Sequence, residues 1–339
     1  MHKTYKNSYK LYFAIIVFVV YLIIVPLAFR NNNYLLNVII TSSILSIISL
    51  GVWLVFAIGR INIGQGAFAL IGGYTSAILL TKTGISFWLA LPLSGILAGL
   101  IGYLIGRPIL RLKGVYFDML TLCMTQFATL AMLNMTKLTS GARGIINIPL
   151  PKALKIAGIT VIPQFTPGNY IPFYYLTALI LIFTFFALVR LNNSRVGRVF
   201  SSLRQHEGLT ASIGIDVVKY RLLAYTICCF LGGLGGSLFV VYTQSIFPTT
   251  FKVADSVNFM LYCFFGGLEY LFGPILGSFL LTISFEYLRV IQKYQEAIYA
   301  VLLILMMLFL PNGLLSIRIG QLHDKTKLFI SKNKKKVEM

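Results

Sequence analysis

Long runs of apolar residues recur along the chain and determine the kind of fold that it can adopt. An α-helix needs about 20 apolar residues to cross a hydrocarbon core about 30 Å thick. Runs of this kind predict membrane spans near residues 11–29, 34–57, 63–81, 85–106, 115–135, 171–190, 221–243, 256–268, 271–289 and 296–317. A transmembrane barrel is excluded, because its strands would alternate in polarity at every residue. The sequence therefore predicts an all-α polytopic membrane protein with about ten spans, or eight as the alternative.

One predicted span, 256–268, is too short to cross a membrane alone. A re-entrant or discontinuous segment is tolerated inside a membrane only where protein covers it. Gly266 and Gly267 at its end, and the Gly273-Pro274 pair that follows, are typical of a break in a helix. We therefore expect this segment to be short or discontinuous.

The basic residues indicate how the chain is oriented. It has 29 Lys and Arg against 9 Asp and Glu, a formal net charge of +20. Most of the basic residues lie in 107–113, in 190–221 and at both termini, and such an excess marks the cytoplasmic side. Both termini are therefore predicted to be cytoplasmic, with 1–320 as one membrane domain and 321–339 as a basic cytoplasmic tail near anionic membrane lipid. This distribution explains the charge without a nucleic-acid partner.

The residue types that bind metals or perform catalysis are scattered. The four cysteines lie in apolar runs without a C-x-x-C spacing, and the three histidines lie outside the predicted spans. The chain has no glycine-rich phosphate loop ending in Gly-Lys-Ser/Thr, so it is not predicted to hydrolyse ATP. We expect no catalytic residues, no metal site and no cofactor bound by this chain.

An ordered set of short motifs extends over most of the sequence. It includes LRLKGVYF at 110–117, TSGARGI at 139–145, SRVGR at 194–198, LGGLGGSL at 231–238, FGGL at 265–268 and FLPNGLL at 309–315. In order and spacing, the set resembles the LivM-type permease family of bacterial branched-chain amino acid ABC importers.

The resemblance implies a multi-pass permease subunit of the bacterial plasma (inner) membrane that translocates branched-chain or other small hydrophobic amino acids. It implies a second related permease subunit, two cytoplasmic ATPase subunits that bind ATP and Mg, and an extracellular solute-binding protein. Related permeases carry urea, short amides or sugars, so these solutes are alternatives. A proton- or sodium-coupled secondary transporter is a further alternative, and it would use Asp118. The place of Asp118 about one turn after Gly114 favours an interfacial position instead.

The resemblance also implies that a cytoplasmic loop near 192–219 couples the chain to the ATPases, through Arg198, Arg204, Glu207, Ala211 and Gly214. The pattern predicts a short helix that Ser194 caps and Gly214 ends. Arg204 and Glu207 are three residues apart, which predicts that they share a helix face and pair. The alternative is an ordinary positively charged loop with a fortuitous glutamate.

Polar and aromatic side chains in two spans are candidates for the solute path, namely Gln65, Phe68, Tyr74, Tyr116, Thr121, Thr125 and Asn134. A polar group inside a membrane is costly, so it faces either protein or a water-filled path. The alternative is helix packing, in which the Gln65 amide bonds a neighbouring backbone and the threonines bond their own helix.

Glycines cluster in the predicted spans 63–81, 221–243 and 256–268, where they let helices approach closely or break. The predicted packing or break positions are Gly64, Gly66, Gly72, Gly73, Gly232, Gly233, Gly235, Gly236, Gly266 and Gly267.

Overall fold

The computed structural model describes residues 18–27, 32–112, 114–156, 159–162, 165–166, 168–289, 294–309 and 313–315. The predicted basic tail at 321–339 and the first residues of the predicted span 11–29 lie outside this part of the chain.

Five helices are long and apolar enough to cross a membrane, namely α2 (Asn33–Phe56), α4 (Phe87–Ile109), α5 (Val115–Asn134), α7 (Ile171–Asn193) and α10 (Val217–Thr243). Shorter apolar helices are Phe18–Leu27, α3 (Gln65–Thr81), α11 (Val253–Gly266), α12 (Gly273–Leu288) and α13 (Gln295–Phe309). The prediction of a helical polytopic membrane protein is confirmed. Each predicted apolar run overlaps one of these helices, and the total number of spans stays a prediction.

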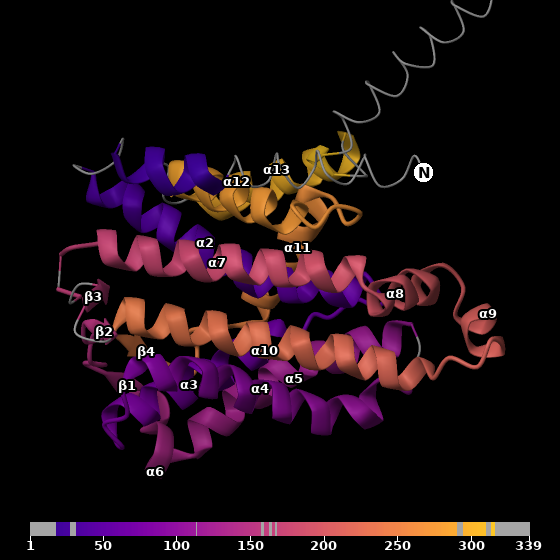
Figure 1. Cartoon of the computed structure of the whole chain (residues 1–339), viewed down its shortest axis with the longest axis horizontal. Coiled ribbons are helices and arrows are strands. Elements are labelled where there is room, and N and C mark those ends of the chain that lie inside the picture. The colour runs from indigo at the N-terminus through magenta and orange to yellow at the C-terminus, as the bar shows by residue number, and fades with distance from the viewer. Residues whose placement is uncertain are drawn as a thin grey trace, which may run out of the picture.

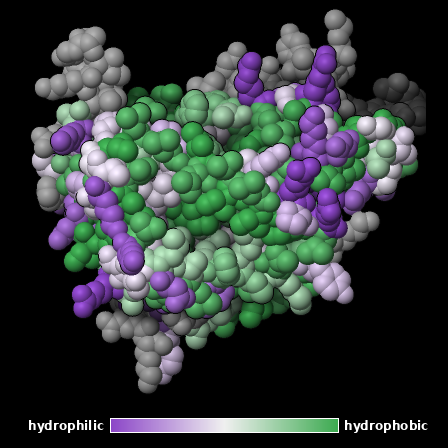
Figure 2. All heavy atoms as spheres, turned by 90° about the horizontal axis from the view of Figure 1, so that it is seen from below, coloured by the Kyte–Doolittle hydropathy of each residue, from purple (hydrophilic) through white to green (hydrophobic). Residues whose placement is uncertain are grey.

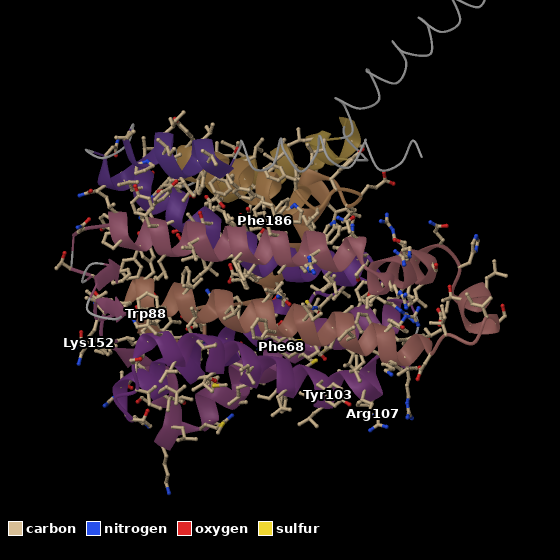
Figure 3. The ribbon with its side chains drawn as sticks, in the orientation of Figure 1. Phe68, Trp88, Tyr103, Arg107, Lys152 and Phe186 are labelled. Atoms are coloured by element: carbon tan, nitrogen blue, oxygen red, sulfur yellow. The ribbon has the colours of Figure 1, made fainter. Side chains whose placement is uncertain are left out.

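The helices lie side by side, with α10 at the centre of the bundle (Figure 1). Its most extensive contacts are with α4, α3 and α2. One end of the bundle carries α8 (Arg195–Gln205) and α9 (Glu207–Ser212). Figure 3 shows Arg107 at this same end, which is called the basic end below.

The opposite end carries the short elements of the loop after α5 and of the loop after α10 (Figure 1). They are α6 (Thr136–Thr139), the 3₁₀ helix η1 (Gly141–Arg143), β1 (Ile145–Ile146), β2 (Leu154–Ile156), β3 (Ile159–Ile162) and β4 (Ser245–Ile246). Strand β1 pairs antiparallel with β4, and β2 pairs antiparallel with β3. The indole N–H of Trp88 donates to the carbonyl of Lys152 at 3.2 Å, and Figure 3 shows both residues at this end.

The surface fits a protein that spans a membrane. Figure 2 shows a band of hydrophobic residues between two ends at which hydrophilic residues gather. Trp88 lies at one of these ends (Figure 3), where the amphipathic indole is suited to the interface between membrane and water. The band and the two polar ends therefore agree with the direction of the long helices.

The glycine-rich segments lie where helices touch. A Cβ built on Gly72 of α3 would meet the backbone of Gly233 in α10, and one built on Gly236 would meet the carbonyl of Ala69. The predicted break after the short span is present, because α11 ends at Gly266 and α12 begins only at Gly273. Gly267 lies in that break with φ +107°, a backbone conformation that side chains with a Cβ rarely adopt.

Candidate coupling site at the basic end of the bundle

Helix α8 begins directly after α7 because Ser194 interrupts the chain between them. The backbone of Ser194 is extended, and its hydroxyl accepts hydrogen bonds from the backbone N–H groups of Val196 at 3.2 Å and Gly197 at 3.5 Å. This is the N-cap that the pattern predicts. The helix buries Phe200 and Leu203. Among the predicted coupling residues, it exposes Arg198 and Arg204.

An ion pair joins helix α9 to the membrane bundle. The two terminal nitrogens of Arg221 donate to the two carboxylate oxygens of Glu207, each at 2.8 Å. Arg221 belongs to the second turn of α10 and is only 5% exposed. Bidentate pairs of this kind are among the strongest charged hydrogen bonds, so α9 is fixed in position relative to α10.

The prediction that Arg204 and Glu207 share a helix face is wrong. Helix α8 ends at Gln205, His206 is extended at φ −149° and ψ 97°, and Glu207 starts a new helix. A spacing of three residues brings side chains together only within one helix. Arg221 was not among the predicted coupling residues, although an arginine at the start of an apolar span is the kind of charge that requires a partner.

The other face of α9 is apolar and uncovered. Leu209 is 66% exposed and Ile213, which follows the helix, is 72% exposed. Thr210 faces the opposite way and is buried. Ala211 is exposed, and Gly214 ends the segment with φ +82°. The segment thus presents two large aliphatic side chains on the basic end, beyond the apolar band.

A pocket of about 400 Å³ lies between this segment and the bundle. Its lining comes from the loop after α2, the start of α5, both short helices and α10, namely Gly59, Arg60, Ile61, Gly114, Asp118, Leu203, Arg204, Glu207 and Arg221. Three arginines and two acids therefore surround one cavity. Asp118 lies in the first turn of α5 and faces this pocket at the basic end of the bundle.

Three charged side chains that line the pocket, Arg60, Asp118 and Arg204, form no ion pair with the described residues. Arg60 is the most buried of them. It is only 7% exposed, and its guanidinium carbon lies 5.9 Å from the centre of the Phe117 ring. Burial lowers the pKa of Arg60, and the nearby Arg221 lowers it further, while Glu207 and Asp118 act in the opposite direction. The arginine still carries its charge at neutral pH.

Gln65 and Phe68 lie at helix contacts in the middle of the bundle. The Gln65 amide nitrogen donates to the carbonyls of Ile48 at 3.1 Å and Cys228 at 3.0 Å. The Phe68 ring packs edge-on against Tyr225, with ring centres 5.8 Å apart. The geometry matches the packing alternative for these two residues, and a place on the solute path stays a prediction.

The remaining candidates for the solute path divide into two groups. Thr121, Thr125 and Tyr74 are buried within the chain. Thr121 accepts from the backbone N–H of Ile63 at 3.2 Å. By contrast, Tyr116 and Asn134 lie on the exposed side of α5, at opposite ends of the helix, so the structure does not bring all the candidates together.

Thr125 takes part in a polar contact that joins three helices. Its hydroxyl lies 3.1 Å from that of Ser256 in α11, and Ser256 accepts from the backbone N–H of Gly66 at the start of α3 at 2.9 Å. Ser256 was not among the predicted residues, because a single serine in an apolar run gives no spacing signal.

Comparison with known proteins identifies the family. Residues 34–310 match the family described as branched-chain amino acid transport system / permease component. The chain is 32% identical over 282 residues to the high-affinity branched-chain amino acid transport system permease protein LivM of Salmonella typhimurium. This match covers 79% of this chain and 66% of that protein. The chain is also 31% identical over 325 residues to the LivM protein of Escherichia coli, and this match covers 91% of this chain and 76% of that protein.

A third relative is named for a different solute. The guanosine ABC transporter permease protein NupQ of Bacillus subtilis is 28% identical over 194 residues, 53% of this chain and 58% of that protein. No solved structure matches the chain. The chain therefore belongs to the family of permease components of branched-chain amino acid transport systems, as a multi-pass membrane subunit and not as an ATPase.

Proposed function

We propose that this chain forms half of the membrane channel of a bacterial ABC importer and moves branched-chain or related hydrophobic amino acids into the cell. The relatives named above as branched-chain amino acid permeases support this choice of solute. An extracellular binding protein delivers the solute, and two cytoplasmic ATPases bind ATP and Mg and drive the cycle.

The ATPases dock on the segment formed by α8 and α9. The observation that supports this most directly is the two-sided nature of α9: one side is fixed to α10 by Glu207 and Arg221, and the other exposes Leu209 and Ile213. A short element with an apolar outer face and a rigid inner anchor can transmit the movement of a bound partner to a membrane helix. In this proposal, α10 is the helix that receives it.

A second, related permease subunit covers the exposed side of α5. Gln126 lies near the middle of this helix and is exposed. An amide in contact with hydrocarbon is unfavourable by several kcal/mol, so Gln126 faces protein or water in the assembled transporter. The face of α5 that carries Gln126 is therefore proposed to meet the partner subunit along the solute path.

The coupling role is tested by exchanging the charges of the ion pair. Glu207→Arg alone places two arginines together and leaves the buried Arg221 without its carboxylate, and a buried charge without a partner is unfavourable. We expect transport-dependent ATP hydrolysis by the assembled complex to fall about tenfold or more, and the double change Glu207→Arg with Arg221→Glu to restore most of it.

The pair formed by Glu286 and Arg289 provides a matched control. Its atoms are 2.9 Å apart, and Glu286 also accepts from Tyr34 at the start of α2, which is the end of that helix away from Arg60. Exchange of these two charges should leave ATP hydrolysis coupled to transport. Full coupling in a well-assembled Glu207→Arg transporter would contradict the proposal.

A further inference from the structure

We infer that the pocket between Arg60, Asp118 and α8–α9 binds a zwitterionic amino acid with an aliphatic side chain on the cytoplasmic side of the membrane. Arg60 takes the carboxylate and Asp118 takes the ammonium group. The inference rests on the proposed function, because it takes the imported amino acid as the ligand.

Arg60 supplies the first argument. Its side chain is nine-tenths buried, lines the pocket and forms no hydrogen bond or ion pair with the residues that the structure describes. Buried charges in proteins are normally paired. Its guanidinium lies over the face of Phe117, which leaves the planar fork of N–H donors available for a carboxylate.

Arg221 supplies a second, independent observation. Its two terminal nitrogens are used by Glu207, but its Nε is buried without a hydrogen-bond partner among the described residues. Arg221 also lowers the pKa of Arg60 by repulsion. An anion between them would satisfy the free donors and relieve this repulsion.

The other residues that line the pocket indicate a ligand with a positive group and an aliphatic part in addition to its negative group. Asp118 provides a carboxylate for a positive group on the same ligand, and Ile61 and Leu203 provide aliphatic surface. The volume of about 400 Å³ falls within the range of about 300–1,000 Å³ that is usual for small-molecule sites. A carboxylate, an ammonium group and an aliphatic chain are the three parts of an amino acid such as leucine.

The location connects the ligand to the transport cycle. The pocket opens at the basic end, next to Leu203 and Arg204 of α8 and Glu207 of α9. An amino acid that leaves toward the cytoplasm would meet this pocket, and when bound it would touch the two helices proposed to dock the ATPases.

The test uses the assembled wild-type transporter in nanodiscs, without the binding protein and without nucleotide. Binding of radiolabelled L-leucine is measured in competition with 4-methylpentanoate, which lacks the ammonium group, with 3-methylbutylamine, which lacks the carboxylate, and with inorganic phosphate. We expect saturable leucine binding, with each competitor at least about tenfold weaker than leucine, since one missing charged contact of about 1.4 kcal/mol corresponds to a factor of ten. Equal displacement by phosphate or by 4-methylpentanoate would show a site for anions alone and would overturn the inference.

Two variants assign the binding to this pocket. Arg60→Gln and Asp118→Asn should each weaken leucine binding at least about tenfold, whereas Arg289→Gln at the other end of the bundle should not change it. Leucine binding that neither pocket variant weakens would place the ligand elsewhere and overturn the inference. If a variant does not assemble, the competition series on the wild type still decides the chemistry of the site.

Two further measurements distinguish a failure of this inference from a failure of the proposed function. ATP-driven leucine uptake without leucine binding at the pocket would refute the inference alone, whereas absence of branched-chain amino acid uptake would refute the proposed function. Binding that appears only after the ATPases are removed would show that a side chain of the ATPase fills the pocket, which also overturns the inference.

Discussion

At the scale of single residues, the Gln65 amide connects three helices in the middle of the bundle. Its nitrogen donates to a carbonyl of α2 and to one of α10, and its oxygen accepts from the thiol of Cys228 at 2.9 Å. Gln65 is itself the first residue of α3. The position at which α3 begins is therefore fixed by side-chain bonds to two neighbouring helices.

Replacement of Gln65 by leucine should weaken the bundle without preventing its assembly. Interhelical hydrogen bonds inside membranes contribute modestly, so the loss of these three should lower stability by roughly 1–2 kcal/mol. The expected result is a melting temperature several degrees lower for the purified subunit in detergent. Gln126→Leu makes the same chemical change on the exposed side of α5 and should not lower the melting temperature. An equal decrease in both variants would contradict the role assigned to Gln65.

The sequence predicts local features of the coupling segment but not its long-range partners. The cap by Ser194 depends only on residues within three positions, which is why the pattern identifies it. The partner of Glu207 lies 14 positions away at Arg221, and it could not be found by helix spacing because His206 separates two helices. The pocket around Arg60 could not be found from helix spacing either, because it joins the loop after α2 to the start of α5 and to α8, α9 and α10, which are distant in the sequence.

At the scale of elements, the contact between α3 and α10 depends on the absence of side chains. A Cβ at Gly236 would overlap the backbone of Ala69, whereas a Cβ at Gly208 in α9 would meet nothing within 4 Å. Gly236→Ala should therefore destabilise the subunit by about 1–3 kcal/mol, the usual effect of overpacking, and Gly208→Ala should be neutral. The amount of monodisperse protein in fluorescence-detected size-exclusion chromatography measures the difference. Equal amounts of the two variants would show that the helices do not pack this closely.

The outer face of α9 leads to a separate prediction about assembly. Leu209→Glu puts a charge into the apolar surface proposed to meet an ATPase, without touching Glu207 or Arg221. We expect co-purification of the ATPase to fall roughly tenfold, equivalent to about 1.4 kcal/mol, with unchanged folding of the permease. Ile146→Glu, on an exposed isoleucine at the opposite end, is the control and should leave ATPase binding intact. Retention of the ATPase by the Leu209→Glu variant would exclude this face as the docking surface.

The apolar runs predict where the helices lie, because helix length in a membrane is set by the thickness of hydrocarbon. They do not predict the small pairing of β1 with β4, which joins Ile145 to Ile246 across a hundred residues with only two residues per strand. Strands this short have no detectable alternation of polarity. The break at Gly267 was predictable, because glycine and proline mark it in the sequence.

At the scale of the whole molecule, the sequence does not show which helices touch. Lipid-facing and packed surfaces of a membrane helix are both apolar, so hydrophobic periodicity does not separate them. The structure does separate them: 83% of the residues in the most apolar stretch of α2 are buried, against 22% in that of α5. The exposed side of α4 is made of large apolar residues such as Leu93, Ile96 and Leu100, whereas the exposed side of α5 includes Gln126.

This difference predicts which side of the subunit meets the second permease. A photoreactive benzoylphenylalanine in place of Phe127, which is exposed one residue after Gln126 on α5, should crosslink to the partner permease in membranes. The same substitution at Leu100 on α4, which is also exposed, should label lipid and give no crosslinked protein. The Gln126 amide next to Phe127 requires that this face of α5 be covered. The apolar face of α4 around Leu100 has no such requirement. Crosslinking to the partner from Leu100 and not from Phe127 would place the subunit interface on α4 and would leave Gln126 without a protein or water contact to explain it.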